Sequence, residues 1–529
     1  MMTPTPFQLL VEGRYHELVA RLRDPNARGT FLQEAAAFAG PANGMPVNAA
    51  DVLAERQLDM RSTGDWSWGL LTEAERKSLF LKEIRLLKGL GVADHGKAQK
   101  QAARRLRNEL PQLLENVDAQ QNDREWLRLM AEHMGDIFDY TNSAQEMLKR
   151  YQLLIAMSLS LEDPILAAFS HLGVSRAEGK LGNNTQALVA AQSALATAQQ
   201  LNDESLLAEA LALLASCETK CGELHQAREH GTESLSIFEK LGNLHGQAKA
   251  LRALAEAEAQ IGNMKESQQC HERARELQTR VGNRRGEAYS LLGVAKIDVI
   301  KGNFSAAQQH QSACLEILSD LEDVYGQAYT SFSLHYSARR LKQRNNADLH
   351  FQRGVELAQY LGNKSLTAWT VSRLGSMALD EGRVAEAGEL YEKATSELRE
   401  CGDAVRLAFC LSCHAVVYFL SSDYKASALK LNEALSMWES MGDKMCMSSL
   451  CACVGALLSK VGNSADGSIC ISNGLHHAST LQYCIEPELM LMIDSAKLDS
   501  IYAHTENEVV MELNELVDFA FARLSEQLV

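Results

Sequence analysis

The chain has 529 residues, of which 46% are hydrophobic and 23% charged. Both values are close to globular averages, which excludes bulk disorder. Lysine and arginine number 52 against 68 acidic residues, giving a net charge of -16, so broad binding to nucleic acid or to an anionic membrane is disfavoured. No apolar run approaches the roughly 18 residues that a membrane-spanning helix needs. We therefore expect a soluble, cytoplasmic protein with no membrane insertion and no nucleic-acid partner.

Prolines are concentrated near the N-terminus. Six of the eight lie before residue 112, which leaves only Pro164 and Pro487 for the rest of the chain. Because proline interrupts helices, a segment of more than 400 residues with so few of them is expected to be helical throughout. The composition therefore favours an all-α fold.

Residues 1–118 are expected to form a helical N-terminal region outside the repeat register of the later chain. The pattern predicts one helix over residues 7–22, followed by loops around Gly40-Pro41. Thr72-x-x-Glu75 has the capping-box spacing and predicts a helix to about Lys88. A further helix is predicted over about 96–116.

Residues 121–480 repeat with a period of forty residues, which predicts nine repeats of two helices each. One turn motif, often Leu-Gly-Asn, recurs at 201–203, 241–243, 281–283, 361–363, 401–403 and 441–443. A second turn recurs halfway between, at 181–183, 221–223, 261–263, 301–303, 381–383 and 461–463. Glycine can close a helix in the left-handed conformation, and the following Asn or Asp can cap the next helix.

Small residues recur in fixed columns between these turns, where packed helices must approach closely. The first-helix column is Gly135, Ser175, Ala215, Ala255, Ala295, His335, Gly375, Ala415 and Gly455. The second helix has two such columns seven residues apart, beginning at Ala187 and Ala194. A helix pair of this kind cannot bury its apolar face alone, so stacking of successive pairs forms one continuous core.

These columns resemble the signature of tetratricopeptide repeats. The forty-residue unit looks more like the variant of Pins-type adaptors, kinesin light chains and Rap-type peptide-regulated proteins than like the standard repeat. The resemblance implies a right-handed α-solenoid of antiparallel helix pairs with a helical N-terminal cap region. The chain departs from the family in the second-helix aromatic column, where only Phe351 and Tyr391 are aromatic.

Residues 481–529 retain only a blurred repeat pattern and are expected to form a degenerate helical C-terminal cap. Pro487 is predicted to start one helix, because proline is favoured in a first helical turn. A final amphipathic helix is predicted from about Glu506, with Val509, Leu513 and Leu516 on its apolar face. This pair would close the exposed end of the solenoid.

The sequence contains none of the usual motifs of nucleotide-binding proteins, zinc-dependent hydrolases or serine hydrolases, so we expect no enzyme activity. Cys410-Leu-Ser-Cys413-His414 has the spacing of a c-type haem attachment, but an intracellular helix does not suit that modification. Cys413 and Cys453 share a column and raise the alternative of a zinc site, against which stands the role of cysteine as a small apolar core residue. We expect no metal and no cofactor.

The first helices resemble the lining of the family's concave groove, and their register places basic and aromatic side chains there. The candidate partner-binding residues are Arg176, Lys180, Lys220, Lys249, Arg252, Tyr289, Lys296, Phe332, Tyr336, Arg339, Arg340, Trp369, Arg373 and Phe409. Cations pair with carboxylates and aromatic rings supply desolvated area, so the pattern predicts binding of an acidic protein or peptide. The alternative is that these cations are scattered solvated residues and the rings fill gaps between repeats.

The resemblance favours a noncatalytic interaction scaffold or adaptor that binds a peptide or protein segment in its groove. Two alternatives stay open. One is a peptide-sensing regulator, which needs two conformations that a ligand stabilises differently. The other is a fixed structural subunit of a large complex, such as one associated with the cytoskeleton or a motor.

Overall fold

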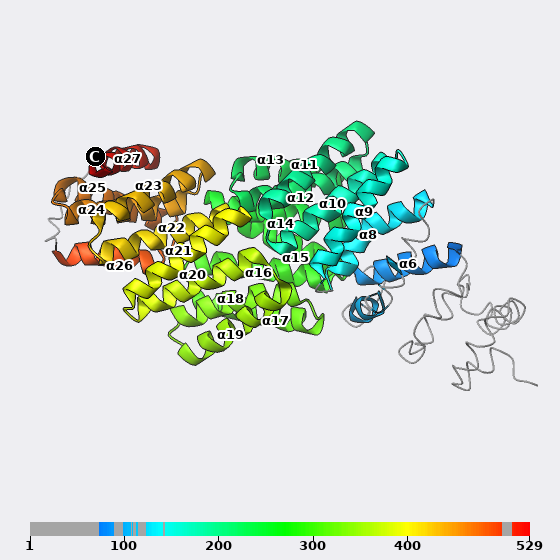
Figure 1. Ribbon diagram of the computed structural model, residues 1–529, viewed down its shortest axis with the longest axis horizontal. Helices are drawn as coiled ribbons and strands as arrows, with labels where there is room; N and C mark the ends of the chain where they lie inside the picture. Colours follow the sequence, from blue (N-terminus) through cyan, green and yellow to red (C-terminus); the bar gives the residue numbers. More distant parts are fainter. Residues whose placement is uncertain are drawn as a thin grey trace, which may run out of the picture. The chain divides into compact units, whose positions relative to one another are not determined.

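The computed structural model describes residues 73–88, 99–106, 108, 110, 113–114, 123–140, 143–499 and 510–528, and every regular element among them is a helix (Figure 1). This confirms the predicted all-α solenoid. The predicted helix over 7–22 and the loop around Gly40-Pro41 lie outside the described residues. The helices are α6 (Glu73–Leu87), α8 (Arg124–Phe138), α9 (Ala144–Ser160), α10 (Pro164–Leu181), α11 (Asn184–Leu201), α12 (Glu204–Cys221), α13 (Leu224–Lys240), α14 (Leu244–Ile261), α15 (Met264–Val281), α16 (Arg284–Ile300), α17 (Phe304–Asp320), α18 (Val324–Arg340), α19 (Arg344–Leu361), α20 (Lys364–Asp380), α21 (Val384–Cys401), α22 (Ala404–Leu420), α23 (Tyr424–Met441), α24 (Lys444–Lys460), α25 (Ser464–Thr480), α26 (Pro487–Asp499) and α27 (Leu513–Leu528).

The chain divides into two compact units, Met1–Leu127 and Arg128–Val529. In the first, α6 carries Phe80, whose ring meets that of Trp126 edge-on at 5.6 Å. Glu83 of the same helix is almost fully buried and binds Arg105, with 2.9 Å between Nη2 and Oε2. A buried carboxylate needs such a partner, so this ion pair fixes α6 against the helical segment 99–106.

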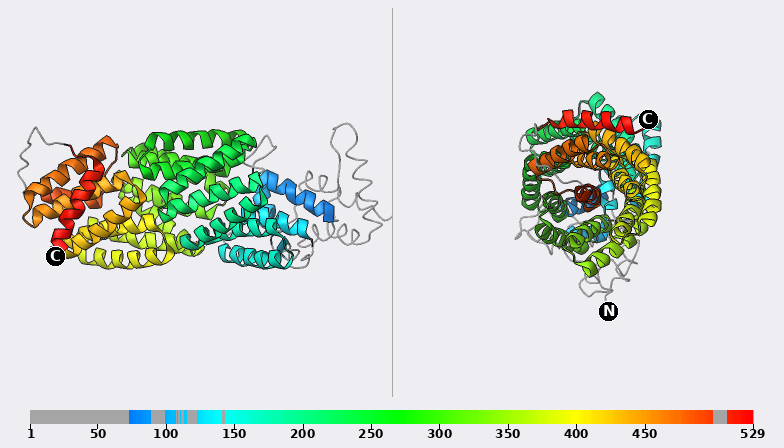
Figure 2. Two further views of the ribbon diagram at one scale, coloured as in Figure 1. Left: turned by 90° about the horizontal axis from the view of Figure 1, so that it is seen from above. Right: turned by 90° about the vertical axis from the view of Figure 1, so that its left-hand side faces the viewer.

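The second unit is a series of helix pairs, each consisting of an even-numbered helix followed by an odd-numbered one. From α9 to α24 every helix packs on the next one along the chain. Even-numbered helices also contact each other, for example α10 with α12 and α12 with α14. In the end-on view of Figure 2 the pairs follow one another around a ring. Helices ten places apart meet again, α12 with α22 and α14 with α24. Five pairs therefore complete one turn of the superhelix.

Direct bonds join the successive turns. Asn363 Nδ2 donates to the backbone oxygen of Lys180 at 2.7 Å, although 183 residues separate them. The backbone nitrogen of Cys484 donates to Ile300 O at 2.8 Å. These contacts depend on the pitch of the superhelix, because a small rotation at each repeat adds up over a full turn.

The turns before even-numbered helices have the predicted caps, whereas most of the others differ. Asn243 and Asn283 each accept a hydrogen bond from the backbone N–H three residues later, at 2.9 Å. Asn183 and Asn263, which precede odd-numbered helices, make no such cap. The Asn183 amide instead donates to Glu178 Oε2 at 2.7 Å. The cap prediction was thus wrong for these two asparagines, whose amide groups donate to a glutamate of the preceding helix.

The turn at 341–343 lacks the usual glycine but keeps the same backbone. Lys342 occupies the glycine position with a φ of 59°, close to the 80° of Gly182. A side chain in this region costs about 1 kcal/mol, which the packing of the flanking helices offsets. The unusual sequence is a tolerated variant rather than a distortion.

Asp443 caps α24 with an oxygen 2.9 Å from the Cys446 backbone nitrogen, yet it is buried. Burial raises its pKa from 3.8 to about 6, and the hydrogen bond from the Cys446 backbone lowers it only in part. The Asp443 carboxyl therefore holds its proton more tightly in the folded state than in the unfolded state. As a result, its contribution to the free energy of unfolding falls as the pH rises from 3.8 to about 6.

We expect Asp443→Asn to raise the free energy of unfolding at pH 7.5 by about 2 kcal/mol, because the amide keeps the cap without the buried charge. Asn243 and Asn283 already cap this way at the same repeat position. Urea unfolding at pH 4 and pH 7.5 measures the effect, and the gain should shrink at the lower pH. An equal or lower stability at pH 7.5 would contradict the argument.

The small-residue columns meet where the sequence predicts. Ser267 Oγ donates to Ala255 O at 2.7 Å, and Ser427 Oγ to Ala415 O at 2.9 Å, both across twelve residues. His335 is the large member of the first column and is accommodated by a bond from its Nδ1 to Ala347 O at 3.0 Å. Burial lowers the pKa of His335 to about 4, so it is neutral at physiological pH.

The C-terminal helices pack on the last repeats. Pro487 starts α26 as predicted, and α26 lies against α22 and α24, whereas α27 contacts α23, α24 and α25. The prediction that the last helix includes residues 510–512 was wrong, since α27 begins at Leu513. Met511 instead bonds through its backbone to Asn473 and His477 of α25, at 2.8 Å each. None of the described helices combines the length and apolar character needed to cross a bilayer.

Candidate functional site

The predicted partner-binding residues all lie on even-numbered helices, from α10 to α22. Most neighbouring members of this set contact each other directly, as α10 and α12 or α20 and α22 do, so they form the more closely spaced row of the solenoid. The structure brings most of the predicted residues together in three groups, which we call the aromatic row, the Asp139 cluster and the Glu488 cluster.

The aromatic row consists of Tyr289, Tyr329, Trp369 and Phe409, one from each of four successive even-numbered helices. Trp369 and Phe409 meet edge-on with ring centroids 5.3 Å apart. Arg373 lies over both rings, at 4.2 Å from the first centroid and 4.7 Å from the second. Such cation–π contacts contribute about 1–2 kcal/mol where the cation is desolvated.

Other arginines continue the same arrangement along the row. The guanidinium of Arg406 lies 5.8 Å from the Tyr329 centroid and 5.5 Å from that of Trp369. Arg252 and Arg285 lie over Tyr289, at 5.3 Å and 5.0 Å. Guanidinium groups therefore alternate with aromatic faces over four helices.

The Asp139 cluster joins the end of α8 to α10, α16 and α18. The Asp139 carboxylate binds Arg176 Nη2 at 2.9 Å, Lys180 Nζ at 3.1 Å and Arg285 Nη1 at 2.9 Å. Arg285 also binds Asp323 at 2.6 Å, and Asp323 accepts a hydrogen bond from the Tyr289 hydroxyl at 3.1 Å. One carboxylate thus connects three cations from two helices.

Electrostatics within this cluster follow from burial and proximity. Burial alone would raise the pKa of Asp139, but the charges of Arg285, Lys180 and Arg176 outweigh it, and the pKa lies well below its ordinary value. Burial lowers the pKa of Lys180, although Asp139 partly offsets this effect. Arg176, Lys180 and Arg285 are therefore already neutralised within the chain.

The Glu488 cluster contains Tyr336, Arg339, Arg340, Arg373, Glu486 and Glu488. Arg339 binds Glu488 Oε1 at 3.2 Å through Nη1 and Asp380 at 2.6 Å through Nε. The Tyr336 hydroxyl donates to Glu486, and Arg340 Nη2 lies 3.1 Å from Cys484 Sγ. These predicted binding residues are thus in contact with the segment that leads into α26.

Five of the predicted cations make no ion pair with any residue that the structure describes. They are Lys220, Arg252, Lys296, Arg340 and Arg373, and of these Arg340 contacts the sulfur of Cys484. Burial lowers the pKa of Arg252, while for Lys220 the surrounding Tyr325, Cys217 and Glu256 outweigh burial and raise the pKa. Both stay charged at neutral pH and add positive charge to the row.

Besides Lys220 and Lys296, two further predicted residues lie apart from the three groups. Lys249 pairs with Glu209 on the neighbouring helix at 3.1 Å. Phe332 is buried and packs edge-on against Phe351, with ring centroids 6.2 Å apart. It supports α18 and α19 from within the core, in place of exposing a ring.

Sequence reasoning missed Arg285, Tyr329 and Arg406. Tyr329 shares the repeat column of Tyr289, Trp369 and Phe409, so the same register could have found it. Arg285 lies four residues before Tyr289, on the same helix face one turn earlier. Extending the predicted groove-facing positions by one helical turn toward the N-terminus would have included Arg285.

The cysteines considered for zinc lie in the core. Cys410, Cys413 and Cys453 are fully buried, and burial raises the pKa of Cys410 to about 12. His414 is stacked between Tyr391 and Tyr418, with centroids at 6.4 Å and 4.7 Å. Within the described segments, no group of three or more His, Cys, Asp or Glu residues could hold a metal ion.

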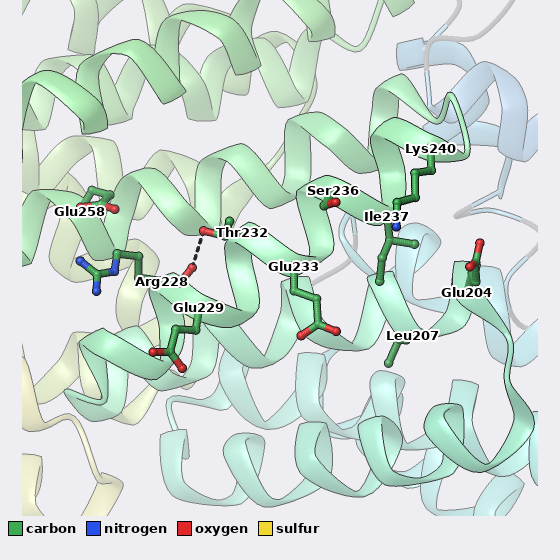
Figure 3. Close-up of a pocket in the computed structure, with 10 residues that line it drawn as sticks. All are labelled: Glu204, Leu207, Arg228, Glu229, Thr232, Glu233, Ser236, Ile237, Lys240 and Glu258. Carbon is green, nitrogen blue, oxygen red and sulfur yellow. Dashed lines mark hydrogen bonds between the residues drawn. The ribbon is translucent and has the colours of Figure 1, made fainter.

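A separate open hollow lies on α12, α13 and α14 (Figure 3). Its lining is mostly charged, with Glu229 and Glu233 beside Arg228 and Lys240 on α13. Thr232 bonds back to the Arg228 carbonyl at 2.8 Å. The hollow contains none of the predicted residues and no aromatic side chain, so it is a weaker candidate than the aromatic row.

The tetratricopeptide repeat profile matches residues 246–320, which cover α14 to α17. A Rap protein complexed with competence and sporulation factor is 12% identical, covers 70% of this chain and 98% of its own, and has a TM-score of 0.52. The Rap conjugation gene regulator of plasmid pLS20 in complex with the Phr* peptide is 14% identical, with 64% and 96% coverage and a TM-score of 0.45. No curated protein matches the sequence. The first structure supports the repeat fold.

Proposed function

We propose that this chain, a repeat protein of the tetratricopeptide type, is a noncatalytic cytoplasmic adaptor that binds an acidic protein segment along its even-numbered helices. The observation that carries the proposal is the aromatic row, in which Tyr289, Tyr329, Trp369 and Phe409 alternate with arginines. Rings on successive helices suit an extended or helical segment that passes from repeat to repeat.

The expected charge of the partner follows from the cations near the row. Lys220, Arg252 and Lys296 have no carboxylate within ion-pair distance among the described residues. Pairing each with a carboxylate of a partner would remove a charge that the fold leaves uncompensated, and would add hydrogen bonds to a charged group. Arginine and large aromatic residues are also the types that dominate binding energy at protein interfaces.

One observation supports the alternative of a ligand-sensing regulator. The bonds between turns, such as Asn363 to the Lys180 carbonyl, form only at one superhelical pitch. A segment that bound better to another pitch would break them and shift the conformation. Solution scattering with and without a bound segment would separate this alternative from a rigid adaptor.

The proposal is tested by partner capture with the Lys220→Glu/Arg252→Glu variant. We expect capture of acidic partners to weaken about tenfold, because two unpaired cations become repulsive. Loss of the Arg252 contact with the Tyr289 ring should cost about 1–2 kcal/mol, so the melting temperature of the variant is measured first and capture is compared at a temperature where it is folded. Arg339 and Arg340 suit this test less well, since Glu488 and Cys484 already contact them.

Arg228→Glu/Lys240→Glu is the matched control. It reverses the same number of charges in the hollow of Figure 3. Capture should be unchanged in this variant. Loss of partners from the control alone would place the binding surface on α13 and refute the proposed one.

A further inference from the structure

The segment before α26 contacts several residues that the sequence predicts as partner-binding. Its Glu486 accepts a hydrogen bond from Tyr336, and Glu488 binds Arg339 at 3.2 Å. The intervening Pro487 starts the helix, so the two glutamates lie two residues apart at its N-terminus. The chain itself therefore supplies the acidic ligand chemistry that the partner would bring.

After these two glutamates, helix α26 has an apolar stripe along one face. Leu489, Met492, Ile493 and Ala496 follow the i, i+3, i+4, i+7 spacing and are almost fully buried. They join the core formed by α22 and α24. An amphipathic helix seated in a groove between helices is a recurring mode of peptide recognition.

The charged part of this contact is incompletely bonded. Arg373 has Nε and Nη2 without hydrogen-bond partners although it is only 3% exposed, and Glu488 Oε2 is likewise buried without a partner. Burial alone would raise the pKa of Glu488, but Arg339 and Arg373 outweigh it and lower the pKa, so its charge is retained. Unbonded buried polar atoms cost free energy, which a better-fitting ligand would recover.

Helix α27 would still cover part of the last repeats if α26 left, although the faces of α22 and α24 under α26 would be uncovered until a partner segment replaced it. Helix α27 packs on α23, α24 and α25, and its core residues Leu516, Ala520 and Leu524 are fully buried. The segment that precedes α26, residues 482–486, has no regular secondary structure. Its backbone donates three hydrogen bonds, from Gln482 and Tyr483 to the end of α25 and from Cys484 N to Ile300 O.

We propose that residues 483–499 are an internal ligand, and that a partner segment binds the same surface by replacing it. This inference rests on the proposed adaptor function and defines the partner more closely. The partner segment carries two acidic residues two positions apart, followed by an amphipathic helix with an i, i+3, i+4, i+7 apolar stripe. While α26 is bound, the C-terminal part of the surface is closed to other ligands.

The test uses a fluorescent peptide with the sequence of residues 482–499 and the full-length chain. We expect the Glu486→Gln/Glu488→Gln variant to bind this peptide about tenfold more tightly than the wild type, because its own segment competes less well. A peptide with the same two glutamates changed to glutamine should bind more weakly. Glu389→Gln/Glu400→Gln, which neutralises two exposed glutamates of α21, is the control and should behave as the wild type.

Equal affinity of the folded variant and the wild type would overturn the proposal. Circular dichroism shows whether the variant is folded. Hydrogen exchange on the ¹⁵N-labelled wild type is a second test, and it does not require the variant to fold. Saturating peptide should increase exchange in the protein's own residues 483–499. Unchanged exchange there would also overturn the proposal.

The two proposals fail in different ways. If the peptide displaces α26 but Lys220→Glu/Arg252→Glu captures the same partners as the wild type, only the proposed adaptor surface is refuted. If the charge reversal abolishes capture while residues 483–499 stay protected, the adaptor stands and the internal ligand is refuted.

Discussion

Asp139→Asn is expected to lower the free energy of unfolding by about 3 kcal/mol. The variant removes the charge that Arg176, Lys180 and Arg285 share, all within 3.1 Å of the carboxylate. Lys180 and Arg285 are at most 22% exposed, so water compensates their charge poorly. Chemical denaturation at neutral pH measures the loss.

The pH dependence of this effect is fixed in direction. The Asp139 pKa is lower in the folded state than its ordinary 3.8, so its contribution is present above that value and is lost as the pH falls through the lowered pKa. The difference in free energy of unfolding between the wild type and the variant should therefore be constant near neutral pH and become smaller in acid.

Asp136→Asn, three residues earlier on α8, is the matched control. Asp136 binds Arg176 at 3.1 Å, and Arg176 retains Asp139 as a second partner when that bond is weakened. We expect a loss of less than about 1 kcal/mol. Equal losses for the two variants would show that Asp139 does not connect the three cations in solution.

The double variant Asp139→Asn/Arg285→Gln should lose less free energy of unfolding than the sum of the losses of the two single variants, because one uncompensated cation is gone.

Gly455→Ala is expected to destabilise the chain by about 3 kcal/mol. A methyl group at this position of α24 would lie 2.5 Å from the backbone oxygen of Gly467 and 2.7 Å from the backbone nitrogen of Ile471. Backbone atoms cannot rotate away as a flexible side chain can, so α24 and α25 would have to separate. Thermal and chemical unfolding measure the cost.

Gly179→Ala is the matched substitution on α10. Only the Lys220 ammonium lies near the added methyl group, at 3.9 Å, so nothing has to move. Because alanine favours the helix over glycine by about 1 kcal/mol, this variant should be as stable as the wild type or slightly more so. A Gly455→Ala protein as stable as Gly179→Ala would contradict the close approach of α24 and α25.

Local chemistry determined the repeats. The forty-residue spacing located the turns between helices, Pro487 marked a helix start, and the small column containing Gly455 marked where helices cross. Side chains in one column fall on one face because successive repeats are nearly identical in geometry. For that reason Tyr289, Trp369 and Phe409 could be grouped from the sequence.

Tertiary structure decided which residues meet at long range. Arg339 and Glu488 lie 149 residues apart, and Lys180 and Asn363 lie 183 apart. No local pattern specifies these pairs, because they depend on the superhelical pitch, which sums a small rotation at every repeat. The sequence by itself determined the helices, their register and the positions of the cations and rings. Only the packed superhelix decided that Asp139 also binds Arg285, 146 residues away, and that α26 binds Arg339, because the partners in both contacts come from distant parts of the chain.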